Sequence, residues 1–266
     1  MTLPAAPEHR PRKRFGQNFL RDRGVVQRIL AALDPQPGET IVEIGPGLGA
    51  LTRPLLERLP RLHVVELDRD LAARLRAEHS PERLSVHEAD ALKFDFCSLA
   101  ASGKTLRLIG NLPYNISTPL LFHLLDQRRC VHDMLFMLQK EVVERMAAVP
   151  GGRDYGRLSV MIQSRMQVEK LFDVHPGAFH PPPKVDSSVV RLVPHATPPV
   201  TIRDAEGFAH LVKAAFAQRR KTLRNNLKGL LPAETIAALG IEPERRAETL
   251  TLAEFATLAN ALPPLD

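Results

Sequence analysis

The sequence predicts an α/β protein with a doubly wound, mainly parallel sheet and a small all-helical C-terminal domain. Short apolar runs alternate with segments of helical periodicity from residue 40 to about residue 148. A glycine-rich turn directly follows the first of these runs, and only helical periodicity is found from residue 205 onward. Strands that alternate with helices are typical of a parallel sheet covered by helices on both faces.

A helix is expected before the sheet begins, because apolar residues recur at helical spacing between Val25 and Leu33 and Pro35 then ends the pattern. Strands are expected at residues 40–44, 62–67, 84–87, 106–109 and 134–138. One helix is expected after the glycine-rich turn, ending at about residue 59, and others are expected at 70–78, 118–126 and 141–148. Beyond Gly156 we expect a helix near 158–166 and two late strands near 168–174 and 188–193.

A proline-rich segment from Pro194 to Val200 separates this pattern from the purely helical region. Prolines in such density favour an extended linker. We therefore predict that residues 1–197 form the larger domain, which carries a basic N-terminal arm, and that residues 198–266 form a helical domain.

Composition excludes several classes of protein. Hydrophobic residues make up 44% of the 266 residues and charged residues 25%, which excludes a disordered chain. No apolar run reaches about 18 residues, and residues 1–14 lack the apolar core of a secretory signal. Cys97 and Cys130 lie far apart in the sequence, which excludes a disulfide scaffold, a zinc ribbon and an iron–sulfur site. These features predict a cytoplasmic protein without a metal or a membrane association.

The net charge of +6 comes from two basic clusters. The first is in the arm and comprises Arg10, Arg12, Lys13, Arg14, Arg21 and Arg23. The second comprises Lys213, Arg219, Arg220, Lys221, Arg224 and Lys228, with no acidic residue between its ends. Apolar residues at 212, 215, 216, 223, 227 and 230 indicate an amphipathic helix with one cationic face. Such a face either keeps a helix soluble or contacts the phosphates of a nucleic acid, and the charge pattern favours the nucleic acid.

The glycine-rich turn has the features of a nucleotide site. Gly45, Gly47 and Gly49 directly follow the 40–44 strand, and Glu66 ends the next strand 21 residues after Gly45. In doubly wound folds an acid at this place accepts hydrogen bonds from ribose hydroxyls. Asp68 is the alternative acid, but Glu66 lies nearer the end of the strand. A tight structural turn is the competing interpretation of the glycines.

Two details of this turn favour S-adenosylmethionine over a dinucleotide. The glycines are spaced G-x-G-x-G, and Pro46 between the first two removes a backbone N–H that a pyrophosphate would need. Asp90, after the third strand, is placed to accept a hydrogen bond from an adenine amine. The alternative role for Asp90 is an N-cap of the following turn.

The segment Asn111-Leu112-Pro113-Tyr114 follows the fourth strand and belongs to the [N/D]-x-P-Y class of amino methyltransferases. The exocyclic amine of adenine is a poor nucleophile, because its lone pair is delocalised into the ring. Two acceptors, the Asn111 side-chain oxygen and the Leu112 carbonyl, would hold its two N–H groups and free the lone pair, while Pro113 fixes the chain and Tyr114 offers a stacking face. The competing interpretation is a plain strand-to-helix turn.

The target base has to leave its stack to reach this segment, so a second aromatic ring opposite Tyr114 is expected. Phe179, beside the triple proline 181–183, is the best candidate in a chain with no Trp and two Tyr. A core phenylalanine beside a rigid loop is the alternative.

Several strings of the sequence together resemble one known family. These strings are Lys13–Leu20, Val42–Gly49, Glu66–Arg69, Gly110–Pro119, Phe136–Val142, Tyr155–Val160, Phe179–Ser187 and Phe216–Asn225. The family is the rRNA adenine N6-methyltransferases, and the strings look most like its bacterial members that dimethylate small-subunit rRNA. The similarity runs from about Arg12 to the C-terminal helices.

The resemblance implies a Rossmann-like methyltransferase domain followed by a helical domain that binds RNA or the ribosome. It implies transfer of four methyl groups from S-adenosyl-L-methionine to two adjacent adenosines in the 3′-terminal hairpin of 16S rRNA. The substrate would be a late precursor of the small ribosomal subunit, and the enzyme a monomer with a role in ribosome biogenesis.

The resemblance also assigns roles to individual residues. The cofactor would contact Asn18, Leu20, Gly45, Glu66, Asp90 and Asn111. Tyr114 and Phe179 would hold the target base. The segment from Gln17 to Leu20 resembles an ordinary helix lead-in on spacing alone, so its role depends on the resemblance.

Two other functions are the alternatives to this one. The first is methylation of an adenine of 23S rRNA by the related macrolide-resistance enzymes, which share the glycine-rich turn and a similar Asn-x-Pro-Tyr segment. The Phe179 loop and the Gln218–Lys221 string look more like the small-subunit enzymes. The second is a non-catalytic ribosome-assembly factor on the same fold, against which Asn111 and Tyr114 argue.

Overall fold

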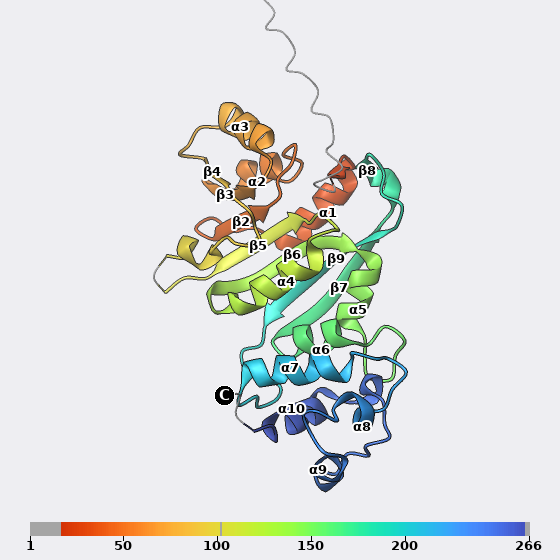
Figure 1. Cartoon of the computed structure of the whole chain (residues 1–266). Helices are drawn as coiled ribbons and strands as arrows, with labels where there is room; N and C mark the ends of the chain where they lie inside the picture. Colours follow the sequence, from red (N-terminus) through yellow and green to blue (C-terminus); the bar gives the residue numbers. More distant parts are fainter. Residues whose placement is uncertain (1–16, 102, 264–266) are drawn as a thin grey trace, which may run out of the picture. The chain divides into compact units, whose positions relative to one another are not determined.

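The structure is a computed structural model and describes residues 17–101 and 103–263 (Figure 1). The cations predicted for the arm from Arg10 to Arg14 lie outside the described residues. Arg21 and Arg23, the last cations of that cluster, are exposed.

The strands and helices follow the predicted alternation closely. The strands are β1 (Phe19–Leu20), β2 (Thr40–Ile44), β3 (Leu62–Glu66), β4 (Leu84–Glu88), β5 (Leu106–Asn111), β6 (Val131–Gln139), β7 (Met166–Val174), β8 (Phe179–His180) and β9 (Ser187–Pro194). The helices are α1 (Arg23–Leu33), α2 (Thr52–Arg58), α3 (Arg69–Glu78), α4 (Ser117–Asp126), α5 (Lys140–Ala147), α6 (Arg157–Gln163), α7 (Ala205–Ala215), α8 (Leu223–Asn226), α9 (Ala233–Ala238) and α10 (Leu252–Asn260). Every strand and helix expected from the sequence between residues 25 and 193 is present, which confirms the predicted order of elements.

The main sheet has seven strands in the order β4-β3-β2-β5-β6-β9-β7 (Figure 1). The pairs β2–β3, β2–β5, β3–β4 and β5–β6 are all parallel. The chain moves outward from β2 to β4 and then returns to the other side of β2 as β5, which makes the sheet doubly wound. The predicted α/β fold class is therefore confirmed. In such sheets the reversal of strand order opens a crevice at the carboxyl ends of the two central strands, here β2 and β5.

The burial of the strands explains why short apolar runs in the sequence predicted them. Ile41, Val42 and Ile44 of β2 are almost completely buried, as expected of a parallel strand covered on both faces. Close packing continues at the end of β5, where Gly110 has no side chain. A Cβ atom there would lie 2.5 Å from the Ile44 carbonyl oxygen, so only glycine allows β2 and β5 to approach this closely.

A second, two-stranded sheet was not expected. β1 pairs with β8 in antiparallel fashion, with Phe19 opposite His180 and Leu20 opposite Phe179. The interpretation of Gln17–Leu20 as a helix lead-in is therefore wrong in part, because α1 begins only at Arg23 after Asp22 has capped it. Strands of two residues are too short to show a two-residue period, so hydrophobic patterning cannot reveal them. We refer to this pair of strands as the β1–β8 ribbon.

The second basic cluster was predicted to lie on one amphipathic helix, but the structure divides it between two helices and a turn. α7 ends at Ala215 and α8 begins at Leu223, with a turn between them. The Asn226 side chain donates to the carbonyl oxygens of Ala215 (2.7 Å) and Gln218 (3.1 Å), which satisfies acceptors at the end of α7. All six cations of this cluster are exposed, as predicted.

The two cysteines, which lie far apart in the sequence, meet in the structure. Cys97 and Cys130 are joined in a disulfide, although 33 residues separate them in sequence. The two short 3-10 helices Phe96–Leu99 and Arg128–Cys130 bring them together. One bridge is not a disulfide scaffold, but the cysteine content no longer supports a reducing compartment.

Two compact units are found in the chain. One comprises the residues up to Lys140 together with Phe172–Val189, and the other comprises Glu141–Leu171 together with the residues from Val190 onward. The second unit thus takes α6 as well as the C-terminal helices. A boundary between independently folding domains near residue 197 stays a prediction.

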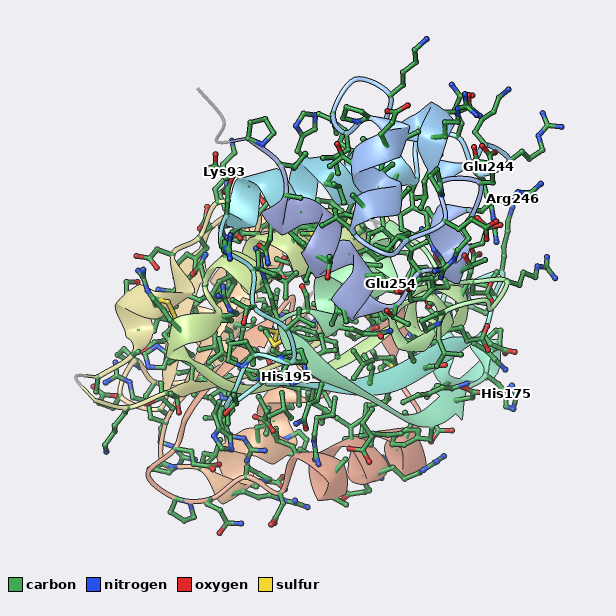
Figure 2. All side chains as sticks on the ribbon, turned by 90° about the horizontal axis from the view of Figure 1, so that it is seen from below. Lys93, His175, His195, Glu244, Arg246 and Glu254 are labelled. Atoms are coloured by element: carbon green, nitrogen blue, oxygen red, sulfur yellow. A yellow bond between two sulfur atoms is a disulfide. The ribbon has the colours of Figure 1, made fainter. Side chains whose placement is uncertain are left out.

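Inside the second unit, ion pairs connect α8 and α10 to the segment between α9 and α10. Arg245 pairs with Glu254 of α10, and Arg224 of α8 pairs with Glu244 at 3.3 Å. Figure 2 marks Glu254, Glu244 and Arg246 on this part of the chain.

In the described part of the chain, no helix has both the length and the apolar character to cross a bilayer.

A buried ion cluster connects the amino-terminal ends of three central elements. Arg107 of β5 is 9% exposed and donates to both carboxylate oxygens of Asp133 in β6, at 2.7 and 2.8 Å. It also pairs with Glu39, just before β2, at 3.0 Å. Asp133 and Glu39 raise the pKa of Arg107, so its charge is permanent. The carboxylates therefore have to stay paired with it for the sheet to be stable.

Replacing Asp133 with Ala should lower the free energy of unfolding by about 3 kcal/mol, because it leaves the buried Arg107 charge with only Glu39 as a carboxylate partner. The control is Glu88→Ala, which removes the exposed partner of Arg76 and should cost less than about 1 kcal/mol. Urea denaturation followed by circular dichroism measures both. Equal losses in the two variants would contradict the role given to the buried cluster.

Candidate active site

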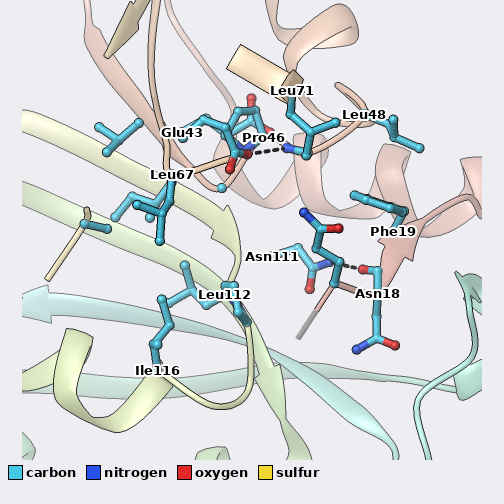
Figure 3. Close-up of a pocket in the computed structure, with 18 of the residues that line it drawn as sticks. Asn18, Phe19, Glu43, Pro46, Leu48, Leu67, Leu71, Asn111, Leu112 and Ile116 are labelled. Carbon is cyan, nitrogen blue, oxygen red and sulfur yellow. Dashed lines mark hydrogen bonds between the residues drawn. The ribbon is translucent and has the colours of Figure 1, made fainter. Parts of the chain in front are cut away.

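A cavity of about 300 Å³ lies at the switch point between β2 and β5. Five segments line it: residues 17–20, 43–51, 65–71, 89–91 and 111–116, though not every residue of the second and third does so. Figure 3 shows this arrangement, with Asn18 and Phe19 on one side and Leu112 and Ile116 on another. The cavity volume is at the lower end of the range found for small-molecule sites.

Most of the site residues predicted from the sequence meet in this cavity. Those that line it are Asn18, Leu20, Gly45, Glu66, Asp90, Asn111, Leu112, Pro113 and Tyr114. They come from parts of the chain up to 96 residues apart. What each of them contacts during the reaction stays a prediction.

The glycine-rich turn is closed by hydrogen bonds within the protein. Gly45 N–H donates to the Val65 carbonyl oxygen at 2.9 Å, and Gly49 N–H donates to that of Pro46 at 2.9 Å. Gly47 N–H donates to Glu66 Oε2 at 3.2 Å. Gly47 has φ +58°, and a Cβ atom there would lie 3.0 Å from the Phe19 ring. The turn thus favours glycine at this position, and the N–H groups of its three glycines are already paired within the protein.

Glu66 is the better placed of the two candidate acids. It is 7% exposed, lines the cavity, and accepts from the backbone N–H groups of Gly47 and Asp68, the latter at 2.8 Å. Burial raises the pKa of Glu66, and the two N–H groups oppose the rise. Asp68 instead caps α3 by accepting from Asp70 N–H at 3.1 Å. A structural task for Asp68 agrees with the preference for Glu66.

Asp90 combines both of the roles weighed for it. Its Oδ1 accepts from Leu92 N–H at 3.0 Å, as a cap of the following turn would. Asp90 also lines the cavity. The cap fixes the carboxylate, so a cavity ligand meets it in a set orientation.

Asn111 ends β5, and its side chain is held by the β1–β8 ribbon. Nδ2 donates to the Asn18 carbonyl oxygen at 2.9 Å (Figure 3). Because Nδ2 is the donor, the side-chain oxygen is the atom that does not face Asn18. The next residue, Leu112, is 1% exposed and donates its N–H to the Met137 carbonyl oxygen at 3.1 Å.

Pro113 and Tyr114 form the transition from β5 to α4. The Pro113 carbonyl oxygen accepts from Ile116 N–H at 3.2 Å and from the Ser117 hydroxyl at 3.0 Å. The Tyr114 hydroxyl lies 2.7 Å from Ser187 Oγ of β9. The segment is therefore the strand-to-helix turn of the alternative interpretation, and it also forms a wall of the cavity.

Phe179 is not among the residues that line the cavity. It is 4% exposed and sits in β8 opposite Leu20. The structure brings the β1 side of the ribbon to the cavity and not the Phe179 side chain. A stacking role for Phe179 stays a prediction.

Phe19, Leu67 and Glu43 are among the cavity residues that were not singled out from the sequence. Phe19 covers Gly47, Leu67 is 50% exposed beside Glu66, and Glu43 is an acid in a buried strand. Glu43 is 2% exposed and accepts from the Thr52 hydroxyl at 2.6 Å. Burial raises its pKa to about 8. Its signal was readable, because a carboxylate within an otherwise apolar run directly before a ligand loop is unusual.

The fold is that of the Rossmann-like class of methyltransferases. A crystal structure of a dimethyladenosine transferase from Plasmodium falciparum superposes with a TM-score of 0.72 over 90% of this chain and 95% of that one, at 26% identity. A crystal structure of the 23S rRNA methyltransferase ErmE superposes with a TM-score of 0.69 over 91% of this chain and 98% of that one, also at 26% identity.

The family model for ribosomal RNA adenine dimethylase matches residues 8–263, and the chain belongs to this family. A ribosomal RNA small subunit methyltransferase A from Laribacter hongkongensis is 63% identical over 95% of this chain and 96% of its own length. A relative with the same name from Pseudomonas aeruginosa is 58% identical over 97% of both chains. The protein is thus an rRNA adenine dimethyltransferase, and the family resemblance identified from its motifs is confirmed.

Glu43 should make the stability of the ligand-free protein depend on pH. Its folded-state pKa of about 8 lies above the ordinary value of 4.5, so the folded state keeps a proton that the unfolded chain loses. This contribution to the free energy of unfolding is complete below pH 4.5 and decreases as the pH rises toward 8, by up to about 1.4 kcal/mol per pH unit.

Glu43→Gln should flatten the curve of unfolding free energy against pH between pH 4.5 and 8. Chemical denaturation at a series of pH values measures the slope. Glu57→Gln, an exposed position on α2, serves as the control and should keep the wild-type slope. A wild-type slope in Glu43→Gln would mean that the carboxyl group is ionised in the folded protein.

Proposed function

We propose that this enzyme transfers methyl groups from S-adenosyl-L-methionine to N6 of two adjacent adenosines in the 3′-terminal hairpin loop of 16S rRNA. The substrate is a precursor of the small ribosomal subunit, and the reaction is a step of ribosome biogenesis. The observation that carries the proposal is the placement of Asn111, Leu112 and Tyr114 at the end of β5 in one cavity with Glu66 and Asp90. The names of the relatives, which specify the small subunit, support the choice of rRNA.

The cavity fits the proposed methyl donor better than a dinucleotide. Gly45, Gly47 and Gly49 all donate their N–H groups within the protein, and Pro46 has none, so none of these four residues has an N–H free for a pyrophosphate. A nucleoside without phosphates needs acceptors for its hydroxyls and its amine, and Glu66 and Asp90 supply them. Asn18, Leu20 and Gly45 would contact the rest of the donor, whose positive charge suits a cavity containing acids.

The donor would supply a methyl group bonded to a sulfonium sulfur, and breaking that S–C bond would release a neutral thioether, a leaving group that needs no acid. The protein therefore has to bring the adenine amine into line and does not need a strong general base. Asn111 Oδ1 and the Leu112 carbonyl oxygen accept the two N–H groups of the amine, which localises the lone pair on nitrogen. Tyr114 presents its ring face to the base. Once methylated, the amine is acidic and loses its proton to water.

RNA contact is assigned to the exposed basic cluster between Lys213 and Lys228. Arg219 donates to the Arg153 carbonyl oxygen, which connects the turn after α7 to the loop before α6. Arg220 and Lys221 lie in the same turn and are exposed. Contacts of this kind go to phosphates and give affinity without reading sequence.

We further propose that the enzyme acts as a monomer in the cytoplasm, where ribosomal precursors are assembled, and that no metal takes part.

The experiment that tests the function is transfer of labelled methyl groups to unmodified small subunits, followed by primer extension across 16S and 23S rRNA. Label at two adjacent adenosines of the 16S hairpin supports the proposal. Modification of a 23S adenine would instead support the activity of the ErmE type. No incorporation at all would leave only a binding role in ribosome assembly.

Asn111→Ala should abolish methyl transfer while leaving small-subunit binding nearly intact, because it removes an acceptor for the amine and no contact to phosphate. Labelled transfer and filter binding to unmodified subunits measure the two effects. If binding were lost together with activity, the role assigned to Asn111 would be incorrect.

Replacing Arg219, Arg220 and Lys221 together with Ala should weaken binding to small subunits and reduce the slope of log affinity against log salt by up to about 2 to 3, the value for three phosphate contacts. Binding isotherms at several salt concentrations measure the slope. Lys93→Ala, an exposed lysine outside the cluster, is the control. An unchanged slope in the triple variant would place the RNA elsewhere.

A further inference from the structure

The Tyr114 ring is held at its hydroxyl end by a buried partner. The Tyr114 hydroxyl and Ser187 Oγ are 2.7 Å apart, and Ser187 is 0% exposed. Burial raises the pKa of the Tyr114 phenol, and the hydrogen bond to Ser187 opposes that rise. A hydrogen bond away from bulk water is not exchanged readily for one to solvent, so it restrains the ring.

The other end of Tyr114 is fixed by the backbone. Pro113 precedes it, and the Pro113 carbonyl oxygen is bound by both Ile116 N–H and Ser117 Oγ. A side chain anchored at Cα and at its terminal oxygen cannot swing about χ1 without breaking a contact. The position and direction of the long axis of the Tyr114 side chain, which lines the cavity, are therefore set before any base arrives.

Ser187 is itself firmly placed. Asp186, the residue before it, accepts from Lys140 N–H at 3.0 Å through its carbonyl oxygen. Ser188, the residue after it, donates its hydroxyl to Asp173 Oδ1 at 2.6 Å. These contacts hold the start of β9 on both sides of Ser187, so its hydroxyl is a rigid support and not a mobile one.

Ser187 also closes the loop that begins at the β1–β8 ribbon. Phe179 and His180 form β8, residues 181–186 follow, and β9 starts at Ser187. The hydroxyl contact thus ties Tyr114 to the far end of the loop whose near end pairs with β1. The wall made by Tyr114 and the ribbon that holds Asn111 are connected through this loop.

We propose that Ser187 is a positioning residue of the methyl-transfer reaction, whose hydroxyl holds the Tyr114 side chain in the place where the target adenine stacks on its ring. The proposal rests on the proposed function, because it needs an adenine in the cavity. Ser187 does not touch the reacting atoms. It removes the need to order the χ1 rotation of Tyr114 when the base binds, and this shows in the rate of transfer and not in donor affinity.

The test uses Ser187→Ala and Tyr114→Phe, which remove the same hydrogen bond from its two ends. Each should lower kcat/KM for transfer to unmodified small subunits about tenfold, with the loss in kcat. The double variant should be no slower than either single variant, because the bond is already absent. Donor affinity, measured by calorimetry, should stay within about twofold of the wild type.

Ser188→Ala is the matched control. It removes a hydroxyl of the same residue type, on the same strand and equally buried, whose partner is Asp173 and not Tyr114. It should keep kcat within about twofold of the wild type. If Ser188→Ala lost as much activity as Ser187→Ala, the effect would come from weakening of β9, and the proposal would be overturned.

A spectroscopic measurement tests the contact without relying on activity. The chain has no Trp and two tyrosines, Tyr114 and Tyr155. In a Tyr155→Phe background, tyrosinate absorbance during alkaline titration reports Tyr114 alone, and Ser187→Ala should raise its pKa. An unchanged pKa would overturn the proposal.

The two readouts separate failure of this proposal from failure of the proposed function. A wild-type enzyme that transfers no methyl groups to small subunits would contradict the proposed function, while the titration would still report the Tyr114 contact. An active wild type with a fully active Ser187→Ala variant would overturn the positioning role alone.

Discussion

The hydrogen bond from Asn111 Nδ2 to the Asn18 carbonyl oxygen is the interaction on which the site depends. An asparagine amide has a donor end and an acceptor end, and only the acceptor end can hold the N–H of a target amine. A backbone carbonyl accepts and cannot donate, so it binds the Nδ2 end and leaves Oδ1 for the substrate. The chemistry proposed for this enzyme therefore requires that a residue 93 positions away in sequence be in place.

Asn18 is held in turn by the β1–β8 ribbon and by the glycine-rich turn. Arg21 N–H donates to the Ala178 carbonyl oxygen at 2.8 Å, next to the paired residues Leu20 and Phe179. Phe19 lies against Gly47, where a Cβ atom would be only 3.0 Å from its ring. The ribbon, the turn after β2 and the end of β5 thus support one another. This explains why a strand of only two residues can be essential to the cavity.

The parts of the fold that could be predicted from the sequence are those in which apolar residues form regular patterns or motif residues recur at fixed spacings. β2 and β5 are runs of buried apolar residues, and the glycines and Glu66 follow at spacings fixed by the parallel sheet. The β1–β8 ribbon escaped prediction because two residues carry no period, and the Cys97–Cys130 bridge because it depends on two short 3-10 helices meeting. The basic cluster was predicted as exposed, but its break after Ala215 depends on the Asn226 side chain, a contact that helical spacing does not encode. Resemblance to relatives, and not periodicity, brought Asn18 and Leu20 into the predicted site.

Two buried carboxyl groups beside one cavity set a further constraint. Glu43 and Glu66 are 2% and 7% exposed, and burial raises the pKa of both. Their mutual repulsion adds to the rise for Glu43. A cationic ligand in this cavity would offset that repulsion, whereas an anionic one would increase it. In the ligand-free site the two groups avoid that repulsion by keeping their protons to a higher pH than exposed glutamates do, and a positively charged methyl donor would favour their ionised forms. The same acids therefore favour a sulfonium over a pyrophosphate, which agrees with the paired glycine amides of the glycine-rich turn.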